Sequence, residues 1–426
     1  MTARDRISES TRPTGRSVDA AEILICIPTY NHADAIAPLL LAAQRSLADF
    51  PNRAGAILQA DGGSTDGTLE RALHAANGSG SLVQVSYPVH PLHKLAVEYQ
   101  TLPGRESAYH TIFSVARDMS AKACCLIEPD VQAIGSSWIS SLVQPIVDAG
   151  FDLVTPQYKR HKYDGLLITG VLYPMVRALF GKRIRQPIGT DFGFSGAMVG
   201  SCLSANHRIT ESARHQIDLW ISLQALQNDL TVCQVSLGGR PRQKKGVTPE
   251  LSTVLADAVG TLFAEIERSA EVWQRVRGSQ AIPTFGLRLD VDTSPAHVDP
   301  SPMVSAFRLG CESLQDVWSR VLSPATLIEL RKLGRVPEES FRLPAELWAR
   351  VLYDFAVGYR LRAIGHDHLL RALTPLYLGW TASFIASIKT ARPSEVEAQI
   401  ELLGGAFEAE KPYLISRWRW PDRFMP

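Results

Sequence analysis

Acidic residues follow two apolar runs of the sequence, in positions where they could bind a ligand. Asp61 comes after "AILQA" and opens the glycine-rich stretch "DGGSTDGT", and Glu128 and Asp130 come after "CCLI". Glycines let a ligand approach the backbone closely, so Asp61 could accept an N–H group from a nucleobase. Two carboxylates spaced i and i+2 could share one hard cation such as Mg²⁺ or Mn²⁺, which can bridge a diphosphate. The alternative for Asp61 is a structural role, as the cap of the next helix.

The runs that carry these acids are predicted to be strands of one sheet. The continuous apolar run "EILICIPTY", 22–30, is typical of a central parallel strand that is buried on both faces. Further strands are predicted at 55–61, 82–87, 123–130 and 151–158, and helical patterns at 31–47, 65–76, 106–121 and 138–149 alternate with them. This alternation predicts an α/β fold with a mostly parallel, doubly wound sheet flanked by helices. Ligands of such sheets bind beyond the carboxyl ends of the strands, where these acids fall.

The sequence changes character after about residue 250, where helical periodicity becomes dominant. We expect a disordered tail over 1–20, an α/β domain over 21–265, a helix and connector over 266–302, and an α-helical C-terminal domain over 303–426. The aromatic residues of the last region have helical spacing and are predicted to lie in its core. A homodimer face is the alternative for them.

The composition excludes several classes of protein. The formal net charge of +1 provides no field that would favour nucleic acid. The longest apolar stretch, 165–181, contains Arg177 and is too short for a transmembrane segment, and residues 1–20 are too polar for a secretory signal. The six scattered cysteines have no metal-ligand spacing and are typical of reduced core thiols. We therefore expect a cytoplasmic protein.

Four motifs together resemble a known family. "IPTYN", "ADGGSTDGT", "PGRESA" and "IEPD" followed by "SSWI" occur in the order and spacing of the nucleotide-sugar-binding half of GT-A glycosyltransferases. The segment 158–198 is similar to the branch that contains mannosylglycerate synthase, glucosylglycerate synthase and glucosyl-3-phosphoglycerate synthase, and the resemblance covers about residues 22–265. It implies a GT-A, Rossmann-like fold. It also implies retaining transfer of a hexose from a GDP-, UDP- or ADP-sugar to a small anionic acceptor such as glycerate or phosphoglycerate, assisted by Mg²⁺ or Mn²⁺.

The same resemblance implies roles for individual residues. The nucleoside pocket would be lined by Pro28, Tyr30 and Asn31, with Asp61 meeting the base. Arg105 would stand near the diphosphate, and Asp191 would line the sugar pocket. Asp130, together with Glu128, would bind the metal, and Asp218 would be the catalytic acid beneath the anomeric carbon of the sugar. The acceptor would be held by a loop that contains Arg160, Tyr163, Asp164 and Thr169.

The chain departs from the family pattern at three places. Glu128 stands where most relatives have Asp, and Gly62 stands where most have a second acid. The stretch "SLGGRPRQKKG", 236–246, lacks the histidine that serves the related enzymes as a metal ligand. Its basic residues could instead neutralise a diphosphate directly. The basic run "KRHK", 159–162, is either a solvated loop or part of an anion-binding site.

Two other functions stay open at this point. The chain could be a glycosyltransferase that acts on a lipid or cell-envelope precursor, with the apolar segment 165–181 and the aromatic helices in contact with a membrane. It could also be a degenerate, non-catalytic protein that binds a sugar nucleotide, as the missing histidine and the altered acidic pair would allow.

Overall fold

The computed structural model describes residues 20–77, 81–89, 102–129, 134–205, 216–239, 250–287 and 290–421. The chain forms two compact units that interleave along the sequence. Unit 1 consists of Met1–Tyr158, Ile188–Thr248 and Pro283–Arg288, and unit 2 consists of Lys159–Pro187, Pro249–Ile282 and Leu289–Pro426. The predicted N-terminal tail lies outside the described residues, apart from Ala20.

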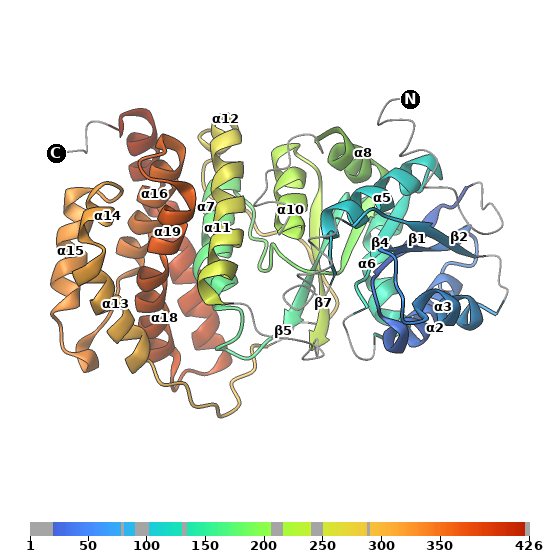
Figure 1. The fold of residues 1–426 in the computed structure, drawn as a ribbon, viewed down its shortest axis with the longest axis horizontal. Coiled ribbons are helices and arrows are strands. Elements are labelled where there is room, and N and C mark those ends of the chain that lie inside the picture. The colour runs from blue at the N-terminus through green and yellow to red at the C-terminus, as the bar shows by residue number, and fades with distance from the viewer. Residues whose placement is uncertain are drawn as a thin grey trace. The chain divides into compact units, whose positions relative to one another are not determined.

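Unit 1 is built on an eight-stranded sheet with the strand order β3-β2-β1-β4-β6-β5-β7-β8 among the described residues (Figure 1). The strands are β1 (Ile23–Thr29), β2 (Gly55–Asp61), β3 (Leu82–Ser86), β4 (Ala123–Leu126), β5 (Leu153–Lys159), β6 (Phe192–Ser195), β7 (Val232–Gly239) and β8 (Thr284–Phe285). The β1 strand pairs in parallel with β2 and β4, and β6 is antiparallel to both β4 and β5. The predicted α/β fold class is confirmed: a mostly parallel sheet flanked by helices.

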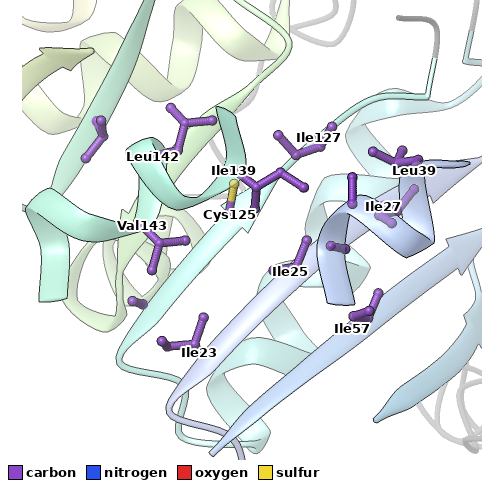
Figure 2. Packing of buried hydrophobic residues seen from close by; sticks show 14 of the residues in the cluster. Ile23, Ile25, Ile27, Leu39, Ile57, Cys125, Ile127, Ile139, Leu142 and Val143 are labelled. Carbon is purple, nitrogen blue, oxygen red and sulfur yellow. The ribbon is translucent and has the colours of Figure 1, made fainter. Parts of the chain in front are cut away.

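The helices of unit 1 form two layers around the sheet. They are α2 (Ala33–Ala48), α3 (Thr68–Ala75), α5 (Arg105–Asp118), α6 (Ser136–Ala149), α8 (Gly196–Ala205) and α10 (Ile217–Gln227). Helix α2 packs against α3 and α6 on one side, and α8 packs against α5 and α10 on the other (Figure 1). Every residue of β1 is buried, as predicted for a central strand. The alternate residues Ile23, Ile25 and Ile27 join α2 and α6 in one apolar cluster (Figure 2).

The register of the sheet brings the polar strand ends to one edge. Thr29 pairs with Asp61, and Asp61 pairs with Ser86 on the next strand. On the other side of β1, Cys26 pairs with Leu126, so Glu128 continues the chain toward the same edge as Thr29. Because the strands are parallel, the loops that follow them all begin at this edge.

Unit 2 consists of helices. They are the π-helix η1 (Ile168–Leu172), α7 (Tyr173–Phe180), α11 (Leu251–Arg268), α12 (Ala270–Trp273), α13 (Ser301–Ser313), α14 (Gln315–Ser319), α15 (Pro324–Gly334), the 3-10 helix η3 (Glu338–Ser340), α16 (Ala345–Leu361), α17 (His366–Ala372), α18 (Thr374–Ile388) and α19 (Pro393–Arg419). The pair Asp354 and Arg417, both without exposed side-chain surface, joins α16 to α19 at 2.9 Å. The predicted helical C-terminal region is therefore confirmed.

The boundaries of the compact units differ from the predicted domains. Residues 159–187 and 249–265 were predicted to belong to the α/β domain, but they pack with the C-terminal helices. Helix α7 explains the difference, because all eight of its residues are buried and it packs against α19. A helix that is buried on all sides needs cover on all sides, and local periodicity does not reveal which distant helix supplies it.

Two further predictions can be compared with the structure. All six cysteines are buried and unpaired, as predicted for core thiols. Among the described residues, no helix has both the length and the apolar character that crossing a membrane requires.

Gly193 on β6 should tolerate no side chain, because a Cβ atom there would lie 2.2 Å from the backbone oxygen of Leu142 on α6. We predict that Gly193→Ala lowers the free energy of unfolding by roughly 1–3 kcal/mol through overpacking. Gly200→Ala on α8 is the matched control, since a Cβ there would meet nothing within 4 Å. That helical alanine should be neutral or stabilising by up to about 1 kcal/mol. Equal effects of the two variants in chemical denaturation would contradict the prediction.

Candidate functional site

Asp61 organises the loop after β2 and is only 2% exposed. Its Oδ1 accepts hydrogen bonds from the hydroxyl groups of Thr29 and Ser64 at 2.7 and 2.6 Å. Its Oδ2 accepts from the backbone N–H groups of Gly63 and Ser64, both at 2.8 Å. Each carboxylate oxygen therefore already has two donors, which matches its two lone pairs. In this arrangement Asp61 shapes the loop, and its contact with a nucleobase stays a prediction.

The loops after β1 and β2 are joined into one structure by side chains. Asn31 adopts a left-handed backbone with φ of 55°, its N–H donates to Ser64 Oγ at 2.8 Å, and its Oδ1 accepts from Thr65 N at 2.9 Å. Asp66 accepts from the first N–H of α2 through Oδ2 and from Thr68, the first residue of α3, through Oδ1. Asp66 thus caps two helices. At α2 this carboxylate approaches from another loop.

The predicted nucleoside residues lie at this edge of the sheet. Pro28 is buried within β1, Asn31 is exposed, and Tyr30 is half-buried with its N–H donating to His32 Nδ1 at 3.0 Å. Their roles toward a nucleoside stay predictions. In the structure, the loop after β2 holds the backbone of the loop after β1 in place.

Tyr87 explains why the chain has glycine at position 62. A Cβ atom on Gly62 would lie 2.6 Å from the Tyr87 hydroxyl, so a second acid cannot stand there while Tyr87 stays in place. The Tyr87 hydroxyl donates instead to backbone carbonyl groups, including that of Pro103 at 3.2 Å. Burial, and then the nearby carboxylates of Asp61 and Glu128, raise the pKa of Tyr87. Tyr87 therefore stays protonated and able to donate to these carbonyl groups.

The second cluster is centred on Arg105, the first residue of α5. Arg105 Nε donates to Glu128 Oε1 at 2.8 Å, and Arg105 Nη2 donates to the Tyr109 hydroxyl at 3.0 Å. The Tyr109 hydroxyl in turn donates to Glu128 Oε1 at 2.8 Å. Only 15% of the Arg105 side chain and 3% of the Glu128 side chain are exposed. Although burial favours the neutral guanidine, the Glu128 carboxylate raises the pKa of Arg105, so the arginine remains charged.

Asp218 completes this cluster from the first turn of α10. Its Oδ1 lies 4.0 Å from Arg105 Nη1, and 8% of its side chain is exposed. Burial raises the pKa of Asp218, while the guanidinium of Arg105 opposes that rise. The structure therefore brings together three residues that the sequence predicted separately: Arg105, Glu128 and Asp218.

Glu128 does not have the surroundings of a metal ligand in this structure. Its Oε1 accepts two hydrogen bonds, and the guanidinium in contact with it would repel a second cation. In the described part of the chain, no group of three or more His, Cys, Asp or Glu side chains could hold a metal ion. Asp130 and the basic residues of 240–245 lie outside the described residues. A metal contact by Asp130 therefore stays a prediction, whereas Glu128 is assigned to holding Arg105.

Asp191, predicted in the sugar pocket, has no exposed surface. Its Oδ2 accepts a hydrogen bond from the Tyr158 hydroxyl at 2.9 Å. The Tyr158 ring stacks on Trp138, with ring centroids 5.9 Å apart. In the structure Asp191 is a buried partner of Tyr158, and its contact with a sugar stays a prediction.

The predicted acceptor residues belong to unit 2, in and after the segment 159–165. Lys162 N donates to the carbonyl of Asp292, and Asp292 N donates to the carbonyl of Arg160, at 2.9 and 3.0 Å. Asp164 is exposed and Tyr163 is half-buried. Thr169 is 8% exposed within the π-helix, a type of helix that is frequent at functional sites. Their contacts with an acceptor stay predictions.

Lys162 has neither of the two roles considered for the basic run 159–162. It is 8% exposed, and its ammonium group donates to the carbonyl oxygens of Ile388 and Lys389 at 2.9 and 2.8 Å. It therefore stabilises the C-terminal end of α18, where unpaired carbonyl groups favour a cation. Such a lysine is not available to an anionic acceptor.

Tyr109 was not predicted from the sequence as a site residue. The signal was present, because Tyr109 lies four residues after Arg105 in a segment predicted as helical, and such residues share one helix face. Thr29 and Ser64, which hold Asp61, belong to the motifs at the ends of the two strands, but their contact with Asp61 was not predicted.

No protein-family profile matches the chain. No curated protein matches it either. Among solved structures, the chain is similar to glucosyl-3-phosphoglycerate synthase from Mycobacterium tuberculosis in complex with Mg²⁺ and uridine diphosphate, with 18% identity, a TM-score of 0.43, and coverage of 59% of this chain and 80% of that chain. The complex of that synthase with Mn²⁺, uridine-diphosphate-glucose and phosphoglyceric acid gives 18% identity and a TM-score of 0.43, with 66% of this chain and 88% of that chain covered. Because the sequence identity and the TM-score are both low, the fold class is assigned from the strand order of this protein's own sheet.

We predict that Asp61→Asn lowers the free energy of unfolding by roughly 1–3 kcal/mol, because the amide NH₂ group would face donors that now bind a carboxylate. Asp34→Asn is the control. Its side chain is 87% exposed and its contact with Arg71 is a surface pair, so little change is expected. Chemical denaturation measures both variants, and equal stability of Asp61→Asn and the parent protein would refute the structural role.

Glu128→Gln should remove the one carboxylate that is hydrogen-bonded to the buried guanidinium of Arg105 among the described residues, since Asp218 lies 4.0 Å away. We expect a loss of about 3 kcal/mol in the free energy of unfolding, as for other buried pairs that lose one partner. Glu22→Gln is the matched control, since Glu22 pairs with Lys122 at the surface, with side-chain exposures of 32% and 69%. Surface pairs contribute little to stability. The assignment fails if both substitutions change stability equally.

Proposed function

We propose that the protein is a glycosyltransferase that moves a hexose from a nucleotide-diphosphate sugar to a small acidic acceptor such as glycerate or phosphoglycerate, with retention of configuration. The observation that carries the proposal is the buried cluster of Arg105, Glu128 and Asp218 at the carboxyl edge of the sheet. A fixed cation beside a buried acid suits a reaction in which a leaving group gains negative charge while the sugar gains positive charge.

The chemistry follows from the charges of these side chains. When the bond between the sugar and the diphosphate breaks, negative charge grows on the diphosphate, and the guanidinium of Arg105 would stabilise it. The Asp218 carboxylate would stabilise the oxocarbenium character of the sugar or fix its position. Arg105 is well placed for this role because Glu128 and Tyr109 already hold it in one orientation, so little reorganisation is needed during the reaction.

The remaining partners belong to the same proposal. The acceptor would be held by Arg160, Tyr163, Asp164 and Thr169 of unit 2. Asp130 would hold Mg²⁺ or Mn²⁺, and such an ion would further neutralise the diphosphate. A homodimer is part of the prediction as well. The choice among UDP, GDP and ADP is left to experiment.

One observation favours a second candidate, a non-catalytic protein that binds sugar nucleotides. Asp61 and Glu128, two acids of the predicted site, are both engaged by hydrogen bonds within the protein. A protein that no longer transfers a sugar could keep such acids because they stabilise its structure. Binding of a sugar nucleotide without transfer to glycerate or 3-phosphoglycerate would identify this candidate.

A thermal-shift panel tests the proposed function. UDP-glucose, GDP-glucose and ADP-glucose are compared with and without Mn²⁺, and with EDTA. We expect one nucleotide to raise the melting temperature by several degrees, since a ligand at 100 times its Kd stabilises by about 2.7 kcal/mol. Arg105→Ala should abolish this shift, whereas the surface variant Arg71→Ala should keep it. No shift with any nucleotide sugar would refute the proposal.

A further inference from the structure

One helix of unit 2 contains an extra residue in its middle. The π-helix η1 continues without a break into α7, and the N–H group of Tyr173 donates to the carbonyl of Ile168, five residues earlier. An α-helix would join residues four apart. Because each residue turns an α-helix by about 100°, one inserted residue rotates the part before the π turn by about that angle relative to α7. Such turns are rare, so the residues around this one should show what supports it.

Pro174 makes the carbonyl of Gly170 depend on a donor from outside the helix. In an α-helix that carbonyl would accept from the residue four positions later, and Pro174 has no N–H group. The indole N–H group of Trp348 on α16 donates to it instead, with Nε1 at 2.7 Å from the oxygen. Trp348 has no exposed surface, so the hydrogen bond forms away from water. Its loss would leave a buried carbonyl group without this donor, which is unfavourable.

A second tryptophan packs against the same glycine. Trp380 on α18 is 3% exposed and stacks on Trp348, with ring centroids 5.9 Å apart. A Cβ atom on Gly170 would overlap the ring of Trp380, so this ring lies directly against the backbone of the π turn. Only glycine allows so close an approach. Two helices of the C-terminal region therefore hold one turn, through a hydrogen bond and through close packing.

The predicted acceptor residues come just before this turn. Thr169, the residue before Gly170, is 8% exposed, and its N–H group donates to the carbonyl of Gly165 at 3.1 Å. A Cβ atom on Gly165 would lie 2.6 Å from Arg160 Nη1, so the guanidinium of Arg160 lies against the backbone of Gly165. Arg160 and Thr169 are thus connected through Gly165, and the π turn sets the direction of this segment relative to α7.

We propose that Trp348 is a positioning residue for the acceptor. Its indole N–H group, with Trp380 packed beside it, holds the π turn, and the π turn directs the segment 160–169 that would bind the acceptor. Trp348 acts through the helix in this proposal, without touching the acceptor. The proposal rests on the proposed function and adds to it a residue that lies 178 positions after Gly170 in the sequence.

Steady-state kinetics of the full chain test the proposal. The acceptors are glycerate and 3-phosphoglycerate, and the donor is whichever of UDP-, GDP- and ADP-glucose supports transfer. Trp348→Phe keeps an aromatic ring and removes the N–H group. We expect the KM for the acceptor to rise roughly tenfold, as when a buried hydrogen bond is lost. The Kd for the donor, measured by calorimetry, should stay at the value of the parent protein.

Trp318→Phe is the matched control. Trp318 is 1% exposed, and its indole N–H group donates to the carbonyl of Ala372 at 3.0 Å, also within unit 2. The substitution removes the same kind of hydrogen bond from the end of α17 instead of from the π turn. We expect it to lower the melting temperature about as much as Trp348→Phe does, and to leave the KM for the acceptor unchanged.

A second substitution separates positioning from stability. Adding Pro174→Ala to Trp348→Phe gives the carbonyl of Gly170 a backbone donor at α-helical spacing. The double variant should regain most of the lost melting temperature, because the carbonyl is paired again. The KM for the acceptor should stay raised, because the turn is then held in another register. If Trp348→Phe alone does not fold, the double variant takes its place in the comparison with Trp318→Phe.

The proposal is wrong if Trp348→Phe leaves the KM for the acceptor unchanged, and the proposed function then survives. Equal rises in Trp348→Phe and Trp318→Phe would assign the effect to stability and overturn the positioning role. A return of the KM to the parent value in the double variant would overturn it as well. If the parent protein transfers no hexose from any of the three donors to either acceptor, the proposed function fails, and this proposal fails with it.

Discussion

A charged guanidinium buried at the edge of the sheet places the strongest constraint on unit 1. Arg105 can remain charged in this setting only if a carboxylate and further hydrogen bonds replace the water that it has lost. Glu128 provides the charge from the end of β4, Tyr109 provides an oxygen from the next turn of α5, and Asp218 lies nearby on α10. The strand β4 and the helices α5 and α10 must therefore keep their mutual positions, and an apolar cluster packs β4 against α2 and α6.

Similar acids at this edge have different uses because their surroundings differ. Asp61 accepts four hydrogen bonds and stabilises the loop that begins with it. Asp218 has an oxygen without a donor in the part of the chain that the structure describes, and it lies 4.0 Å from the guanidinium of Arg105. An acid whose lone pairs are filled has little to offer a ligand, whereas an acid with an unfilled oxygen gains by binding one. Asp218 therefore has an oxygen that a ligand could satisfy, whereas the lone pairs of Asp61 are already used within the protein.

The predicted donor residues and the predicted acceptor residues belong to different compact units. The segment 159–187 leaves the sheet after β5, forms the π-helix and α7, and returns to the sheet through β6. Within unit 2 this segment is anchored by buried charged side chains, such as Lys162 on the end of α18 and Arg177 between Glu401 and Glu408. The predicted donor residues therefore belong to the sheet unit and the predicted acceptor residues to the helical unit.

The sequence by itself determined the strands and their polar ends, because burial on both faces leaves the continuous apolar run of β1 and because glycines and acids mark the loops. It also placed Arg105, Glu128 and Asp218 at a common site through family resemblance. Only the tertiary structure decided what each side chain does there. The Tyr87 hydroxyl excludes a second acid at position 62. The side chains of Tyr109 and Glu128 orient Arg105. Helix α7 belongs to unit 2 because it packs against α19. Hydrogen bonding and packing depend on groups distant in sequence that meet only after folding, so local spacing could not reveal them.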